Sequence, residues 1–495
     1  MRKSIILLLS VFFYLTKLSA DSPLFIYLNN NMIYRYIDYQ INSGKSVPDF
    51  AFQQPLKLSQ LGLVKPSDLN EFYIKKQKRY YGEKNTSIGL EHQGFLEKTD
   101  SWNYLYRFDF NFHYRSDFLT LGNRTRVDRK YKYDPYYAGD LSEADHWIYG
   151  RVNDAYLTLD IKKYGFFIGK INRNWGPVGE KSLILSDNPY SFDHFMFTYT
   201  GKLMMLTTYF SQLDFIKGTE YHPSDSTYMN FPKVNRYLTG HRLDISISNN
   251  FQIGLTEMAI YGGENRDIEL AYLNPMTFYY GVQRNDRKDM SGLWAMDIMY
   301  KPIKKVTLYG QFLIDDIIVN NDPGVDDRAR YPDRLGLMIS ARSGDLFANG
   351  LNLNLTYIRI WNRTYQSLRN WECYQYRGLG IGYPSASCEE YKFKLGLWKF
   401  FPMYLESEFE IGRYGDVNVS DIFPCVIEKF PVNPTRYHYS NSLKFIYNMT
   451  TSTTLGIDVT LKGGERYLIR DSSEKNNTFE IRFYYDTFFM SNFEL

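Results

Sequence analysis

The stretch Trp102–Tyr114, with the sequence WNYLYRFDFNFHY, places an aromatic side chain at every second position. The intervening residues are polar except for one leucine: Asn103, Leu105, Arg107, Asp109, Asn111 and His113. Successive side chains of a β-strand point to opposite faces, so the stretch predicts a strand with one aromatic and one polar face. Its length of about 13 residues exceeds that of most globular strands and suffices for a tilted membrane crossing of about 9–11 residues.

The same alternation recurs along the chain, in the stretches Leu351–Tyr357, Leu455–Leu461 and Phe479–Phe483. In Leu405–Ile411 the polar face carries three carboxylates, those of Glu406, Glu408 and Glu410. These charges would be costly in the dry core of a secreted β-sandwich or β-propeller, whereas a hydrated barrel lumen tolerates them. A barrel is therefore the favoured fold, and a sandwich or propeller is the alternative.

Strands that cross lipid must close into a barrel, since an open sheet edge would leave backbone groups unpaired in hydrocarbon. We therefore predict an all-β fold, a transmembrane antiparallel β-barrel over residues 85–495. About 23 residues per strand, loops included, gives about 18 strands, an even number as bacterial barrels prefer.

The first 20 residues have the features of a signal peptide: the basic pair Arg2–Lys3, the apolar run Ser4–Leu15 and the small residue Ala20. A short membrane anchor is the alternative, but the apolar run is too short to span a bilayer. We expect residues 1–20 to be cleaved and the barrel to reach the cell outer membrane of a Gram-negative bacterium, in contact with its lipid.

Residues 21–84 show a helical period in place of a strand period. Ile33, Ile37 and Ile41 recur at every fourth position, and Gly44 follows where a helix end favours a left-handed residue. A second helical pattern runs from Pro66 to Gly82. We predict a small N-terminal helical bundle that plugs the barrel or packs on its periplasmic end.

The aromatic content and the net charge of the chain limit the kinds of partner that it can bind. The chain has 45 Tyr, 35 Phe and 7 Trp among 495 residues, yet its mean hydropathy is −0.41, so the rings are interleaved with polar residues. Without residues 1–20, which contain three basic residues and no acidic one, the formal charge of +3 falls to zero. A neutral chain argues against nucleic acid as a partner, because phosphate binding needs clustered positive charge.

Catalytic and metal-binding motifs are missing from the sequence. Gly44-Lys45-Ser46 resembles the end of a phosphate-binding loop. That loop requires another glycine five positions before Gly44, and this position is occupied by Tyr39. The seven histidines are scattered, and we interpret His241 and Arg242 as a hydrogen-bonding pair in the lumen. We therefore predict no enzyme activity, no cofactor and no metal; an outer-membrane phospholipase or protease with its residues on separate strands is the alternative.

The three cysteines, Cys373, Cys388 and Cys425, allow three pairings in an oxidising compartment. We favour a disulfide between Cys373 and Cys388, which would close a local loop. The Cys-x-x-Cys spacing of metal sites does not occur.

The most specific string is Asn172–Pro177 (NRNWGP), followed by Ser182–Asn188 (SLILSDN). It resembles the capsule-assembly Wzi-type outer-membrane family, whose members carry a W-G-P…S-L-I-L-S-x-N string. The stretches Arg236–Leu243, Glu269–Pro275 and Ile33–Leu56 also resemble the family. The spacer Val178–Lys181 departs from the family pattern.

This resemblance implies an 18-stranded barrel, plugged by helices, that acts as a lectin and holds capsular polysaccharide or another exopolysaccharide on the cell surface. Sugar recognition uses aromatic faces, amides, carboxylates and arginine. The candidate binding residues are Asn172, Arg173, Asn174, Trp175, Asp187, Asn188, Tyr131, Tyr133, Tyr136 and Tyr137. The alternative for the string is a tight turn folded into the lumen, with Asp187 and Asn188 tying loop backbone.

Two further questions stay open in the sequence. Lys130, Lys132, Arg173 and Arg377 are candidates for a local grip on uronic acids. An outer-membrane porin or diffusion channel for sugars or small solutes is the rival function, because it would share the fold. In either case we expect a monomer.

Overall fold

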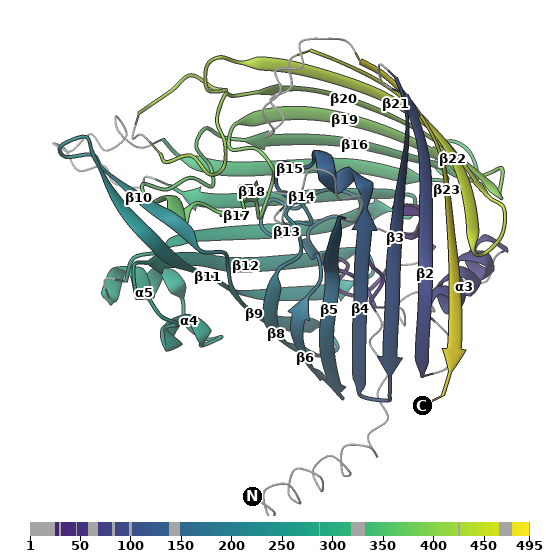
Figure 1. The fold of residues 1–495 in the computed structure, drawn as a ribbon, viewed down its shortest axis with the longest axis horizontal. Coiled ribbons are helices and arrows are strands. Elements are labelled where there is room, and N and C mark those ends of the chain that lie inside the picture. The colour runs from purple at the N-terminus through teal and green to yellow at the C-terminus, as the bar shows by residue number, and fades with distance from the viewer. Residues whose placement is uncertain are drawn as a thin grey trace, which may run out of the picture.

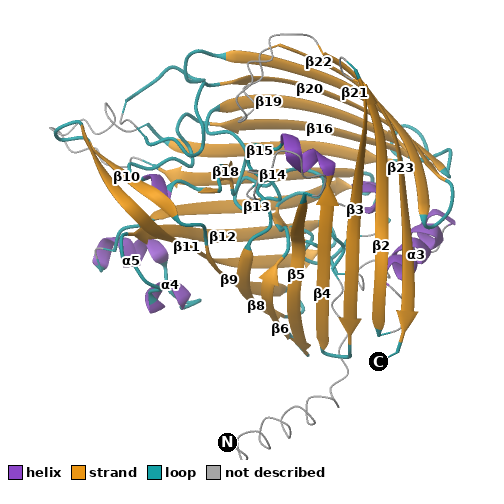
Figure 2. Ribbon diagram, in the orientation of Figure 1, coloured by secondary structure: helices purple, strands orange, loops and turns teal. Residues whose placement is uncertain are grey.

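In the computed structural model, residues 25–28, 31–45, 47–57, 68–81, 85–98, 101–137, 149–286, 288–317, 332–423, 426–464 and 478–494 are described. Eighteen strands of this part of the chain form one closed antiparallel sheet, the predicted barrel (Figure 1). Strands on its near and far sides cross at a steep angle in this view, as tilted barrel strands do (Figure 2). The signal-peptide prediction for residues 1–20 lies outside the described residues.

The barrel strands follow chain order around the wall. They are β2 (Thr86–Lys98), β3 (Trp102–Arg115), β4 (Leu119–Asp128), β5 (Gly150–Ile161), β6 (Tyr164–Lys170), β8 (Asp193–Thr200), β9 (Met204–Gln212), β11 (Thr227–Ser248), β12 (Phe251–Gly263), β13 (Ser291–Ile303), β14 (Val306–Asp316), β15 (Arg334–Gly344), β16 (Leu351–Ile360), β19 (Cys388–Leu397), β20 (Met403–Tyr414), β21 (Arg436–Asn448), β22 (Thr453–Gly464) and β23 (Thr478–Phe493). The first and last strands pair from Thr86 with Phe493 to Lys98 with Ile481, and this closes the barrel.

One strand lies outside this circular order. β10 (Ile216–His222) pairs with the first part of β11, while β9 pairs with its second part. β11 is 22 residues long, so its first part projects beyond the wall as a hairpin with β10 (Figure 1).

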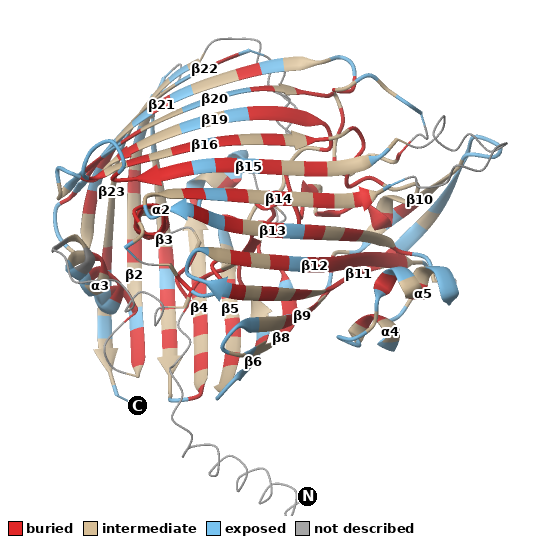
Figure 3. Ribbon diagram, turned by 180° about the vertical axis from the view of Figure 1, so that it is seen from behind, coloured by how far each residue is buried: buried red, intermediate tan, exposed pale blue. Residues whose placement is uncertain are grey.

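The strand alternation confirms the predicted faces. On β3, Tyr104 and Phe110 are exposed on the outer surface, while Asp109, Asn111 and His113 are buried in the lumen. Burial alternates along most barrel strands (Figure 3). An outer apolar surface and a polar interior are what a bilayer and a hydrated lumen select.

Two helices occupy the end of the barrel where the connections are short. Within the described ranges, α2 (Asn31–Asn42) and α3 (Asp68–Tyr81) follow the predicted helical periods, and neither is long and apolar enough to cross a membrane. Gly44 follows α2 with φ +66°, and a side chain there would collide with the backbone of Lys304 in the short β13–β14 turn. Only glycine fits this close approach without strain.

Buried ion pairs fix α2 to the inner face of the wall. Arg35 donates to Glu406 of β20 at 2.7 Å, and Arg342 of β15 donates to Asp38 at 2.7 Å. Asn352 and Asn354 of β16 also donate to Asp38. Removing one partner of such a buried pair costs about 3–5 kcal/mol, so α2 is held firmly inside the lumen.

Loops from the opposite end fold inward to meet the N-terminal segment. β1 (Gln53–Gln54) pairs with β7 (Asn174–Trp175) inside the barrel, and β17 (Gln375–Tyr376) pairs with β18 (Leu379–Gly380). The short helix η4 (Asn370–Glu372) belongs to the same inward loop as β17. Large buried side chains such as Trp175 and Tyr365 fill the lumen between them.

The predicted disulfide between Cys373 and Cys388 is wrong, because both residues are buried free thiols. Cys373 Sγ donates to the carbonyl oxygens of Arg369 and Asp421, whereas Cys388 begins β19 in register with Ile360 and Tyr414. The two side chains therefore lie in different packing environments. Cys425 lies outside the described residues.

The interpretation of His241 and Arg242 as a lumen pair is also wrong. The two residues are adjacent on β11, so their side chains lie on opposite faces. Arg242 is buried in the lumen between Asp244 and Asp297, while His241 contacts Glu257 on the outer surface at 3.0 Å.

Candidate functional site

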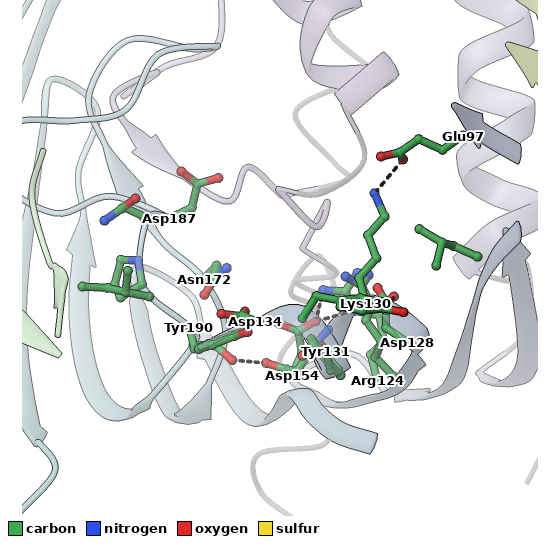
Figure 4. A pocket seen from close by; sticks show the side chains of 18 of the residues that line it. Glu97, Arg124, Asp128, Lys130, Tyr131, Asp134, Asp154, Asn172, Asp187 and Tyr190 are labelled. Carbon is green, nitrogen blue, oxygen red and sulfur yellow. Dashed lines mark hydrogen bonds and ion pairs between the residues drawn. The ribbon is translucent and has the colours of Figure 1, made fainter. Parts of the chain in front are cut away.

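A cavity of about 860 Å³ lies between the inner face of strands β2 to β5 and two inward loops. It is lined by Glu97, Asn103, Leu105, Arg124, Arg126, Asp128, Lys130, Tyr131, Tyr133, Asp134, Asn153, Asp154, Asn172, Asp187, Asn188, Pro189, Tyr190, Ser191 and Leu379. Asp187 and Asn172 lie on one side of it, and Glu97 with Lys130 on the other (Figure 4). The two sequence-predicted groups, the tyrosine loop (Tyr131–Tyr137) and the W-G-P string (Asn172–Asn188), therefore meet at one cavity.

The tyrosine loop is shaped by a short 3₁₀ helix, η2 (Arg129–Tyr133), directly after β4. Asp128 caps the helix: its side chain accepts a hydrogen bond from the backbone N–H of Lys130 at 2.9 Å. Aspartate is a favoured residue at this position, since its carboxylate satisfies a free N–H of the first turn. The cap turns the chain inward so that Tyr131 and Tyr133 line the cavity.

The rings of Tyr131 and Tyr190 line one wall of the site, and Tyr137 packs behind them. Tyr131 stacks on Tyr137 with ring centroids 4.9 Å apart and packs edge-on against Tyr190 at 6.3 Å. The hydroxyl of Tyr131 donates to Asn153 at 3.2 Å, and that of Tyr190 donates to Asp134. Burial raises the pKa of Tyr131, so this hydroxyl stays protonated.

Tyr133 differs from its neighbours because 67% of it is exposed. Within the described part of the chain its hydroxyl has no hydrogen-bond partner, and no other ring stacks on it. It therefore offers both a free aromatic face and a free hydroxyl beside the cavity.

The W-G-P string is held by hydrogen bonds to its own loop and to the wall. Ser182 Oγ donates to the carbonyl oxygen of Trp175 at 2.6 Å, and Gln311 Nε2 of β14 donates to the same oxygen at 2.9 Å. Asn174 Nδ2 donates to the carbonyl oxygen of Glu180 at 3.0 Å. Trp175 is fully buried and does not line the cavity. Asn174 and Trp175 thus hold the loop.

Arg173 is buried as well, away from the cavity. Its Nε donates to Nε2 of His194 at 2.6 Å, and its guanidinium lies 4.4 Å from the ring centroid of Phe167. Burial lowers the pKa of Arg173 to about 10. The side chain is enclosed by rings and is out of reach of a ligand in the cavity.

Asn172, Asp187 and Asn188 are the members of the string that reach the cavity. Asn188 Nδ2 donates to the carbonyl oxygen of Gly380 at 2.9 Å, which ties this edge to the neighbouring loop. Asp187 lies 3.5 Å from Lys181 and is partly exposed. The amide of Asn172 has no hydrogen-bond partner among the described residues, so it is free to bind a ligand.

Each cation that lines the cavity is neutralised by a carboxylate. Arg124 pairs with Asp154 at 2.5 Å, Arg126 with Asp109 at 2.7 Å, and Lys130 with Glu97 at 3.3 Å. Burial, together with the nearby Arg482 charge, lowers the pKa of Lys130. The site therefore presents rings, amides and carboxylates but no unpaired cation among the described lining residues.

This geometry separates the ten predicted binding residues. Tyr131, Tyr133, Asn172, Asp187 and Asn188 line the cavity, whereas Arg173, Asn174 and Trp175 are buried behind it. The ring of Tyr137 stacks on that of Tyr131, and Tyr136 lies against Gly378 of the neighbouring loop.

The sequence interpretation missed Tyr190, Asp134, Asn153 and Glu97. Tyr190 lies two residues after the string, and that proximity was the available signal. Nothing in the sequence placed Glu97 opposite this loop.

The predicted grip on uronic acids is not assembled at this cavity. Lys130 is paired and Arg173 is buried, while Lys132 and Arg377 do not line the cavity. Arg377 instead lies 5.5 Å from the ring centroid of Tyr376.

The sequence model of the family described as capsule assembly protein Wzi matches residues 90–382. Among solved structures, the chain is similar to Wzi of Escherichia coli, an outer membrane protein involved in group 1 capsule assembly and a carbohydrate-binding β-barrel. The identity is 12%, the match covers 96% of this chain and 100% of that one, and the TM-score is 0.63. At this identity the likeness shows the fold alone.

Two further structures give weaker likenesses. OccAB2 of Acinetobacter baumannii has 8% identity over 82% of this chain and 98% of that one, with a TM-score of 0.48. OccD3 of Pseudomonas aeruginosa has 10% identity over 82% and 91%, with a TM-score of 0.47. These two likenesses carry no argument about function. No curated protein sequence matches the chain.

Proposed function

Because the match to the capsule assembly protein Wzi family spans more than half of its residues, the chain belongs to that family, and we propose that it is an outer-membrane barrel that binds a cell-surface polysaccharide and holds it on the cell. The observation that carries this proposal is the cavity at which Tyr133, Asn172 and Asp187 converge from two separate loops. Its volume of about 860 Å³ lies within the range of about 300–1,000 Å³ typical of ligand sites.

The side chains suit a sugar. The exposed ring of Tyr133 offers a face to the C–H patches of a pyranose, and the free amide of Asn172 can both donate to and accept from hydroxyls. Asp187 adds an acceptor for hydroxyl or amino groups. We propose a capsular polysaccharide or another exopolysaccharide as the ligand, retained by many modest contacts along a repeating chain.

The charge pattern favours neutral or amine-bearing sugars over uronic acids. The lining cations are committed to Asp154, Asp109 and Glu97, Asp187 is paired with Lys181, and Asp134 adds negative charge. A ligand carboxylate would meet like charge without an unpaired partner, which disfavours its binding.

The barrel surface supports the proposed location. Leu355, Ile339 and Phe409 are exposed on the outer wall, on strands whose inner faces are polar. A bilayer would cover this belt. Since the sheet is completed within one chain, we propose that the protein works as a monomer.

A deletion strain complemented with variants tests the proposal. The triple variant Tyr133→Ala/Asn172→Ala/Asp187→Ala should shed polysaccharide into the medium while the heat-modifiable barrel still assembles. Tyr228→Ala, which removes a ring with 59% exposure that does not line the cavity, is the matched control. Parental levels of cell-bound polysaccharide in the triple variant would contradict the proposal.

Passage of small solutes is a second candidate function, and one observation favours it. A second cavity of about 450 Å³ shares Asp128 and Lys130 with the first and reaches Lys76 of α3. A third, of about 260 Å³, shares Lys444 and Asp458 with the second.

The plug opposes free diffusion along this series, since α2 is fixed to the inner wall by ion pairs. Planar bilayers decide between the two functions: we expect no large stable openings, and such openings would favour the porin.

A further inference from the structure

The segment between β12 and β13 lies outside the barrel, against the outer faces of β11 and β12. It contains α4 (Leu270–Leu273) and α5 (Tyr279–Asn285), and opposite views place both helices beside the wall (Figures 1 and 3). The alternation of side chains along the strands also places the segment outside. Glu257 lies on the same face of β12 as Leu255, and His241 lies on the same face of β11 as Ile247; Leu255 and Ile247 are exposed on the outer surface.

The wall beneath this segment is polar where a barrel normally presents apolar residues. His241 and Glu257 are register partners on β11 and β12, and their side chains meet at 3.0 Å. A charged pair on a lipid-facing wall would be costly if it were left uncovered.

The segment buries Glu257 and leaves 18% of the His241 side chain exposed. The backbone N–H groups of Tyr279 and Tyr280 donate to the Glu257 carboxylate at 3.2 and 3.3 Å, and Trp294 Nε1 donates to it at 2.9 Å. The ring of Tyr279 lies 4.8 Å from that of His241. Glu257 therefore has four donors, and only 5% of it is exposed.

A tyrosine cluster continues the cover above the pair. Tyr261 of β12 stacks on Tyr272 with centroids 4.3 Å apart, and Tyr272 and Tyr279 are fully buried. Thr239 of β11 donates to the carbonyl oxygen of Tyr272 at 2.6 Å. The inner side of the segment is thus packed as tightly as a protein core.

The outer side of the segment is apolar and largely exposed. Leu270 and Met276 are each 82% exposed, and Phe278 is 66% exposed. From Leu270 to Gln283 the sequence carries no charged residue, whereas Glu269 and Arg284 bound the stretch on either side.

This apolar surface is continuous with the lipid-facing wall. Phe278 and Tyr280 contact Trp294 of β13, with ring centroids 6.1 and 5.7 Å apart. Met296, two residues further on the same face of β13, is exposed on the outer wall.

We propose that residues 270–283 form a shelf immersed in the outer leaflet, with Leu270, Met276 and Phe278 against lipid acyl chains. The charged residues at its ends, Arg266, Glu269, Arg284 and Lys288, lie at the headgroup level. The shelf lets a polar His241–Glu257 pair exist on a membrane wall by replacing lipid with protein hydrogen-bond donors. This inference rests on the barrel spanning a bilayer, as proposed above.

Photo-crosslinking tests the shelf in the intact protein. The benzophenone amino acid p-benzoylphenylalanine replaces one residue at a time in protein reconstituted into vesicles of phospholipid and lipopolysaccharide. The positions are 278 on the shelf, 355 on the outer face of β16 and 224 at the tip of the β10–β11 hairpin. Leu355 is 56% exposed on the outer wall, and Ser224 is exposed on the hairpin.

We expect lipid adducts at positions 278 and 355 in similar yield and at least tenfold less at 224. Lipid adducts at 355 without any at 278 would overturn the shelf while leaving the barrel in the membrane. No adducts at either position would overturn the membrane location itself. In intact cells, a protein adduct at 278 in place of lipid would mean that a protein partner occupies this surface, and it would also overturn the proposal.

Discussion

Tyrosine rings gather at two places in this molecule, one on each side of the barrel wall. The inner tyrosine cluster, in the lumen, is Tyr131, Tyr137 and Tyr190. The outer tyrosine cluster, on the membrane side, is Tyr237, Tyr261, Tyr272 and Tyr279. In both clusters the hydroxyls are engaged: Tyr131 donates to Asn153, for example, and Tyr279 bonds with Thr239.

The difference lies in what borders the rings. The inner cluster adjoins an open cavity with the exposed ring of Tyr133, a free amide and carboxylates. The outer cluster is sealed between a strand wall and a helical segment, with Tyr272 and Tyr279 fully buried. Residue type alone therefore assigns no function to a tyrosine cluster, and the adjoining space decides between ligand surface and packing.

Tyr272→Ala should have the largest effect, on stability and not on binding. Truncating a fully buried aromatic ring costs about 3–5 kcal/mol of the free energy of unfolding. Urea or heat unfolding of the vesicle-reconstituted barrel measures it, with Tyr228→Ala as the control. Unchanged stability, or a loss of polysaccharide affinity at intact stability, would erase the distinction between the two clusters.

Glu257→Ala should destabilise the barrel by about 2–3 kcal/mol, because it leaves His241, Trp294 and the N-terminal N–H groups of α5 without their buried acceptor. Glu257→Gln keeps the volume and one acceptor oxygen and should lose less than half as much. Equal losses for the two variants would show that packing, and not the hydrogen bonds, holds the outer cover.

The sequence predicts the barrel because its wall obeys a strict rule. A period of two in Trp102–Tyr114 assigns each ring to one face, and the burial of Asp109 and His113 confirms it. The helix containing Ile33, Ile37 and Ile41 is predicted for the same reason, since its apolar face follows a helical period.

The alternation of apolar and polar residues fails to predict positions whose environment is set by tertiary contacts. His241 and Glu257 are polar residues on the outer wall, which the alternation cannot foresee because their cover comes from residues 270–283. Likewise, adjacency in the W-G-P string could not tell buried Trp175 from Asn172 at the cavity, because loops have no fixed period.

Asn172→Ala and Asp187→Ala should each weaken polysaccharide binding about two- to twelvefold. Each removes a hydrogen-bonding group that contributes about 0.5–1.5 kcal/mol. Isothermal titration with purified polysaccharide measures the loss. Asn174→Ala is the informative contrast: its amide ties the loop backbone, so it should lower stability before it lowers affinity. A pure affinity loss in Asn174→Ala would contradict the assignment of Asn174 to the loop scaffold.

Salt should have the smallest effect. Since the lining cations are paired with Asp154, Asp109 and Glu97, we expect less than about a threefold change in affinity between low and moderately high salt. Retention assays at several salt concentrations measure this. A steep loss of binding with salt would show that unpaired charges grip an anionic polymer.

The affinity of Tyr133→Ala relative to Tyr228→Ala tests the central claim most directly, because both variants remove an exposed tyrosine ring and only one of the two rings lines the cavity. The loss of one stacked ring, about 1–2 kcal/mol, should raise the dissociation constant of the polysaccharide about tenfold in Tyr133→Ala. Tyr228→Ala should bind as the parent does. Equal affinity of the two variants, or a loss confined to Tyr228→Ala, would contradict the cavity as the polysaccharide site.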